Sequence, residues 1–72
     1  MRAERIAKYV RQRPFKALEI RLENGEKHVI RRPESIIVGR TFVVIMTPKE
    51  DVVSFESTAV YSVRKLARGN GR

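Results

Sequence analysis

Basic residues at regular spacing are the feature of this sequence that could do chemistry. Near its start, four of them recur every three residues: Arg2, Arg5, Lys8 and Arg11. On a helix this spacing covers the outward surface, where the charges could follow the phosphate groups of a nucleic acid and make binding salt-dependent. A solvated helix face explains the spacing equally well. We take Arg5, Lys8 and Arg11 as candidate nucleic-acid contacts.

Three more arginines stand beside predicted turns in the middle of the chain. Arg31 and Arg32 close a predicted strand, and Arg40 follows Gly39 in a turn. Arginine in loops is a favoured partner for phosphate and stacks on unpaired bases. These three join the candidate nucleic-acid-binding residues and could lie on loops at one end of the fold, with ordinary loop polarity as the alternative.

The net charge of +8 is concentrated at the ends of the chain. Residues 1–16 carry +5 and residues 64–72 carry +4, whereas residues 17–63 carry −1. Clustered positive charge indicates a polyanion or an acidic surface as the partner, although solubility alone also favours surplus charge. We expect the partner to be RNA, single-stranded, with DNA as the alternative.

The residues of an active site are missing. One histidine (His28) and one aspartate (Asp51) stand on different predicted hairpins, whereas a nucleophilic triad needs its base beside the hydroxyl. Without cysteine there is neither a thiolate zinc site nor a catalytic thiol, and His28 alone does not make a metal site. Glu19, Glu23 and Glu26 are better explained as a solvated hairpin face than as an acid–base pair. We therefore expect a binding or structural module with no catalytic residue, no metal and no cofactor.

Length and composition limit the class of protein. Seventy-two residues suffice for one domain, or for half of a domain completed by a second copy. With 42% hydrophobic residues the chain is too apolar to be intrinsically disordered, and no apolar run is long enough to cross a membrane, so no membrane partner is expected. The start lacks the apolar core of a signal peptide, and this, with the missing cysteine, fits a cytoplasmic location.

A helix is predicted over residues 3–12. Its apolar residues follow helical spacing and form one stripe: Ala3, Ile6, Ala7 and Val10. Pro14 lacks the hydrogen-bond donor that a helix needs and restricts Arg13, so the helix must end there. So short a helix is marginal alone and must pack on another element.

The hydrophobic period then changes to two and predicts a strand. Its inward face consists of Leu18, Ile20 and Leu22. Asn24-Gly25 predicts a hairpin, because both residues tolerate a positive φ. A two-residue turn would place Val29 on the inward face, whereas a three-residue turn with Gly25 in a bulge would place His28 and Ile30 there. We prefer the bulge, because it puts Ile30 beside Leu18.

Four later strands complete the predicted fold. A second strand covers residues 26–32, Pro33 suggests a bend, and residues 35–38 lead to a turn. The remaining strands cover residues 41–47, 52–56 and 59–66. We expect 41–47 to be buried on both faces, because it is a continuous apolar run.

One helix followed by five short antiparallel strands is a mainly β pattern in a single domain over residues 1–66. So small a sheet must curl into a barrel of the Sm-like, SH3-like or OB type, because a flat sheet would leave its edges open. Residues 67–72 have nothing to bury and should form a disordered basic tail.

Leu22-Glu23-Asn24-Gly25, at the end of the first strand, resembles the Leu-x-Asn-Gly signature of the Sm-like family, which includes bacterial Hfq. The order of elements over residues 3–66 is similar as well. The family's Asp-x-Met-Asn loop is replaced here by residues 38–41. The resemblance implies a small RNA-binding barrel that joins its neighbours, edge to edge through the last two strands, into a ring of five to seven copies.

The last two predicted strands supply the expected oligomer interface. Its residues are Val52, Val53 and Phe55 on one strand, and Val60, Tyr61 and Val63 on the next. They are too apolar to be left as exposed borders, so we expect a homo-oligomer whose ring multiplies the basic surface. The competing interpretation is a structural barrel that oligomerises and binds an acidic protein partner.

Overall fold

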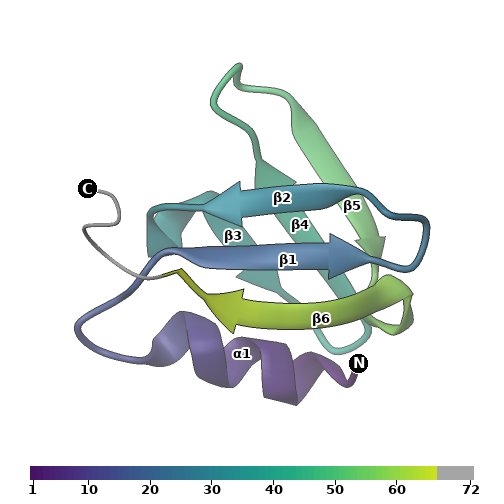
Figure 1. Cartoon of the computed structure of the whole chain (residues 1–72), viewed down its shortest axis with the longest axis horizontal. Coiled ribbons are helices and arrows are strands. Elements are labelled where there is room, and N and C mark those ends of the chain that lie inside the picture. Colours follow the sequence, from purple (N-terminus) through teal and green to yellow (C-terminus); the bar gives the residue numbers. More distant parts are fainter. Residues whose placement is uncertain (67–72) are drawn as a thin grey trace.

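Two three-stranded antiparallel sheets face each other, and one helix covers the side between them (Figure 1). The computed structural model describes residues 1–66. In chain order the elements are α1 (Ala3–Arg11), β1 (Leu18–Leu22), β2 (Lys27–Ile30), η1 (Pro33–Ser35), β3 (Ile36–Val38), β4 (Phe42–Met46), β5 (Val52–Glu56), η2 (Ser57–Ala59) and β6 (Val60–Lys65), where η marks a 3-10 turn. The strand order is β2-β1-β6 in the first sheet and β3-β4-β5 in the second. The mainly β fold with an N-terminal helix is confirmed, and the expected tail lies outside the described residues.

Helix α1 packs by its apolar stripe, as its spacing predicts. Ile6 is fully buried in the core, and Val10 packs against it. The helix ends at Arg11, shortly before Pro14. At the other end the Met1 ammonium donates hydrogen bonds to the carbonyls of Ser57 (3.2 Å) and Val60 (3.1 Å), which ties the helix to the start of β6.

The first hairpin closes through a three-residue turn. Gly25 adopts a φ of 94°, its N–H donates to the Leu22 carbonyl, and the Leu22 N–H donates to the Glu26 carbonyl at 2.8 Å. This bulge pairs Leu18 with Ile30 and turns Ile30 into the core. The register with Gly25 in a bulge is thereby confirmed.

The chain has six strands in two open sheets, so the predicted five-stranded closed barrel is wrong. Pro33 has no N–H for a strand ladder, and η1 begins there. The chain therefore leaves the first sheet at Ile30 and enters the second as a separate strand at Ile36. At η2 it returns in the same way, from β5 to β6, so each sheet keeps two edge strands.

Strand β4 is buried on one face, which corrects the expectation of burial on both. Val43 and Ile45 point into the core, whereas Phe42 and Met46 remain 46% and 52% exposed. The reason is that only one apolar layer separates the two sheets, and no described residue covers the outer face of the second sheet. A continuous apolar run therefore marks a two-sided strand only when a second layer exists to cover it.

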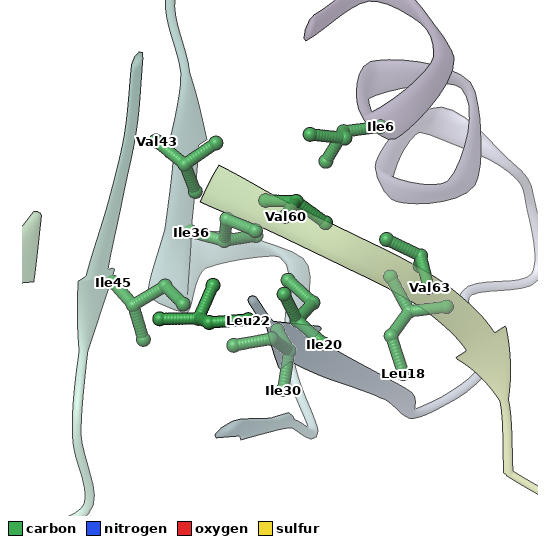
Figure 2. Close-up of a cluster of buried hydrophobic side chains, with 10 residues drawn as sticks. All are labelled: Ile6, Leu18, Ile20, Leu22, Ile30, Ile36, Val43, Ile45, Val60 and Val63. Atoms are coloured by element: carbon green, nitrogen blue, oxygen red, sulfur yellow. The ribbon is translucent and has the colours of Figure 1, made fainter. Parts of the chain in front are cut away.

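The core lies between the sheets and is aliphatic (Figure 2). It consists of Ile6, Leu18, Ile20, Leu22, Ile30, Ile36, Val43, Ile45, Val60 and Val63. Along the side away from the helix, the His28 ring on β2 stacks on the Phe55 ring on β5, with centroids 6.1 Å apart. This contact joins an edge strand of each sheet where no backbone pairing does.

Candidate nucleic-acid interface

The outward face of α1 carries the predicted basic residues, all of them exposed. Because Ile6 and Val10 hold the opposite face in the core, Arg5, Lys8 and Arg11 point away from the sheets. A groove beside the helix is lined by Arg5 and Lys8 together with Lys65 from the end of β6. The helix and the last strand thus share one basic surface.

Arg40 lies in the tight turn before β4, close to the helix that docks beside it. A Cβ atom at Gly39 would overlap the far end of the Phe42 ring, so any larger residue there would displace this half-exposed side chain. The Gly39 N–H donates to the Phe42 carbonyl at 2.8 Å and closes the turn. Arg40 and Arg11 consequently line one groove between α1 and this turn. Sequence alone does not bring these two residues together.

Arg31 and Arg32 lie elsewhere. Both are exposed and line a groove between β2 and the β4–β5 turn, together with Lys27 and Glu50. The structure therefore places the three predicted loop arginines in two grooves, Arg40 beside the helix and the other two across the fold, instead of at one end.

Sequence reasoning missed a cluster on the outer face of the first sheet. Arg21 and Lys27 are direct cross-strand partners, and the alternation of the ladder makes them a non-hydrogen-bonded pair, whose side chains lie closest. Neither forms an ion pair within the described residues. In the next row, Arg64 donates from Nε to Glu19 Oε1 at 2.9 Å. The outer face of the first sheet thus carries two basic residues without an acidic partner, Arg21 and Lys27, beside the ion pair of Arg64 and Glu19.

Tyr61 adds an aromatic ring next to this cluster. It is the extra residue of a bulge in β6, between the pairs Arg21–Ser62 and Leu22–Val60, and it is 63% exposed. Bulges often re-aim a side chain, and here the ring points away from the core. The residue was predicted as part of an oligomer interface, and its position also suits base stacking.

The residues predicted for oligomer contacts divide into two groups. Val60 and Val63 are in the core, and Val53 and Phe55 lie half-buried on the inner side of β5. Their side chains therefore pack within the chain. Val52 and Tyr61 are exposed, and β5 and β6 are both edge strands. Only these two side chains, with the backbone edges, remain open to a neighbour.

Among residues 1–66, no group of three or more histidine, aspartate or glutamate side chains is placed to hold a metal ion. The same part of the chain has no helix of the length and apolarity that would cross a membrane. Comparisons of the chain with models of protein families, with curated proteins and with solved structures find no match. The resemblance to the Sm-like family therefore stays a prediction.

Proposed function

We propose that this protein binds single-stranded RNA through a basic surface that runs from α1 across β6 to the outer face of the first sheet. One observation carries the proposal. Of the fourteen lysine and arginine side chains within residues 1–66, only Arg2 and Arg64 form an ion pair with a carboxylate of the same part of the chain. Unpaired like charges repel one another and destabilise a small fold. Phosphate groups would remove that repulsion.

The basic side chains lie on both sides of the edge strand β6: Lys65, paired with the inward-facing Leu18, is on the helix side, and Arg21 and Lys27 are on the outer face. Arg5 and Lys8 share a groove with Lys65 at the end of β6, and Figure 1 shows α1 running along that strand. Beyond β6 lies the outer face of β1 and β2, where Arg21 and Lys27 stand opposite each other. A single strand laid across these elements would meet a cation at each of them.

A single strand fits this surface better than a duplex does. The nine-residue helix α1 packs its apolar face against the core and lies flat along the body of the protein. It therefore does not project outward as a helix that enters the major groove of a duplex does. Exposed Tyr61 offers a ring on which one unpaired base can stack. The resemblance to Sm-like proteins favours RNA over DNA.

Assembly through strand edges belongs to the same proposal. β5 pairs only with β4 and β6 only with β1 within the described residues. β5 therefore has a free backbone edge, and β6 has one beyond Val60, whose carbonyl accepts a hydrogen bond from the Met1 ammonium. Pairing β5 of one copy with β6 of the next would satisfy both edges, and repetition would close a ring. A ring would place several basic surfaces on one RNA and raise its avidity.

Fluorescence anisotropy with a labelled RNA of about 12 nucleotides, a length typical of single-strand sites, tests the proposal. The variant Arg5→Gln/Lys8→Gln removes two predicted phosphate contacts, and Lys16→Gln/Lys49→Gln is the matched control with the same net charge. For a single strand, each phosphate contact raises log K by about 0.7 when the salt concentration falls tenfold. Two contacts, counted from 1 M down to 0.1 M salt, amount to about 1.4 in log K, so the first variant should bind about 25-fold more weakly at 0.1 M salt. The control should bind like the wild type.

Competition experiments with the bound RNA distinguish a nucleic-acid partner from an acidic protein. Excess polyglutamate should leave most RNA bound, and single-stranded RNA should outcompete duplex RNA of the same sequence. Loss of RNA to polyglutamate would assign the surface to an acidic protein instead. No retention of RNA or DNA at about 0.1 M salt, where screening is moderate, would overturn the proposal.

A further inference from the structure

The outer face of the second sheet is apolar and open. Along its central row Ile37, Val44 and Ser54 are paired neighbours, with Phe42 on one side of this row and Met46 beside Val52 on the other. Ile37 and Val52 are 62% and 65% exposed. With Phe42 and Met46 they expose about 400 Å² of apolar surface, as much as the largest patch of a typical monomer, and often a functional one.

Charge distinguishes this face from the rest of the molecule. β3, β4 and β5 contain no lysine or arginine, and their one charged residue is Glu56. The helix and the first sheet, by contrast, carry unpaired basic residues. Two positively charged copies can therefore approach each other through this face without bringing their basic surfaces together.

We infer that this face packs against the same face of a second copy, forming a two-fold dimer. Its two ends carry complementary charges. Arg40 and Glu56 lie at the end near Phe42, and the β4–β5 turn at the opposite end holds Lys49, Glu50 and Asp51. The two-fold axis lies between the second sheet of one copy and the second sheet of the other, and it runs across their strands. Each end of the face then packs on the opposite end of the partner's face. Arg40 then comes near Glu50 and Asp51 of the partner's turn, whereas Glu56, the ladder neighbour of Phe42, lies over the partner's Val52.

This axis fixes which side chains meet. Because the central row lies on the axis, Ile37 packs against the partner's Ile37. Phe42 packs against the partner's Met46, a contact between sulfur and an aromatic ring that is favourable in itself. The apolar area supplies the centre of an interface of about 800 Å² per copy, and the charged ends supply its polar rim. The contact uses side chains only, so it does not depend on the edge pairing proposed above.

The chemistry of the rim argues for a second copy over a lipid surface. An apolar face that binds anionic lipid is bordered by lysine and arginine. Here the two basic residues of the border, Arg40 and Lys49, are outnumbered by Glu50, Asp51 and Glu56, and these acids would meet the anionic headgroups.

Sedimentation equilibrium of the whole chain tests the dimer. Ile37→Glu places two like charges on the axis, and Val29→Glu is the control, since Val29 is also an exposed apolar residue on an edge strand, in the first sheet. At about 100 µM, well above a micromolar dissociation constant, the wild type and Val29→Glu should have twice the mass of Ile37→Glu. Equal masses of the wild type and Ile37→Glu would overturn the inference, as would an equal loss of mass in Val29→Glu.

Cross-linking gives a second readout that does not depend on a disruptive charge. The chain has no cysteine, so one introduced residue is the only thiol. Packed sheets lie about 10 Å apart, too far for a disulfide, so a short bis-maleimide is the suitable reagent. Ile37→Cys should cross-link to a second copy of itself, and a mixture of Phe42→Cys and Met46→Cys should cross-link more than either alone. Failure of Ile37→Cys to cross-link, or wild-type binding to phosphatidylserine vesicles that Ile37→Glu abolishes, would overturn the inference.

Discussion

Replacing Lys27 by glutamate should make the protein more stable and a poorer RNA binder at once. Lys27 faces Arg21 across the first hairpin, and the pair has no carboxylate partner within the described residues. Like charges directly opposite on two strands destabilise a sheet. Glutamate at this position would form with Arg21 the same kind of pair that Glu19 forms with Arg64 in the next row.

The size of the effect follows from the geometry of the pair. Unit charges about 6 Å apart in water interact by about 0.7 kcal/mol, and salt at 0.1 M roughly halves this. Changing repulsion into attraction counts the term twice, so Lys27→Glu should raise the free energy of unfolding by about 0.7 kcal/mol. Lys27→Gln removes only the repulsion and should give about half. For a domain of this size, the full change is about 3–6 °C in Tm.

Urea denaturation and thermal melts measure the stability, and anisotropy measures RNA binding. Lys16→Glu is the control, because it makes the same change of net charge at an exposed residue outside the strands. The gain should shrink at about 0.5 M salt, where screening is stronger. If Lys16→Glu stabilises the fold as much as Lys27→Glu does, the gain comes from net charge and the reasoning about the cross-strand pair is refuted. If RNA affinity is unchanged, the pair does not contact phosphate.

Three further predictions concern the helix, the second hairpin and the open edge. Changing Arg5, Lys8 and Arg11 together to glutamine should reduce the salt dependence of RNA binding by about three contacts, with the melting temperature nearly unchanged; a constant slope would assign these charges to solubility. Glu50 has a φ of 68°, so Glu50→Gly should raise the free energy of unfolding by about 0.5–1 kcal/mol in urea titrations, and a decrease would contradict the strain. The Ser54 N–H points away from β4, so Ser54→Pro should keep the fold and lower the assembled mass in sedimentation; an unchanged mass would exclude the β5 edge from assembly.

The parts of the fold that depend on residues close together in the sequence could be predicted from the sequence. The stripe containing Ile6 and the break at Pro14 define the helix, because both act within a few residues. The bulge at Gly25 follows from its freedom to adopt a positive φ, and the choice of register followed from pairing Ile30 with Leu18.

Features that depend on distant segments could not be predicted in the same way. The exposed Phe42 and Met46 belong to an apolar run like that of a two-sided strand, and only the number of layers in the fold shows otherwise. Arg21 and Lys27 became partners only once the register was known. Arg40 was grouped with the other loop arginines, because its place beside Arg11 depends on how α1 docks.

The tight turn at Gly39 also has a consequence for how sequences of this kind can diverge. The Phe42 ring occupies the space that a side chain at position 39 would need, so a change at position 39 acts on position 42 as well. A lineage that acquired alanine at position 39 would have to turn the aromatic ring away or lose it, whereas loss of the ring alone would leave the space beside position 39 open. Homologous sequences should therefore favour glycine at position 39 where position 42 is aromatic, and should carry larger residues at 39 more often together with a smaller residue at 42.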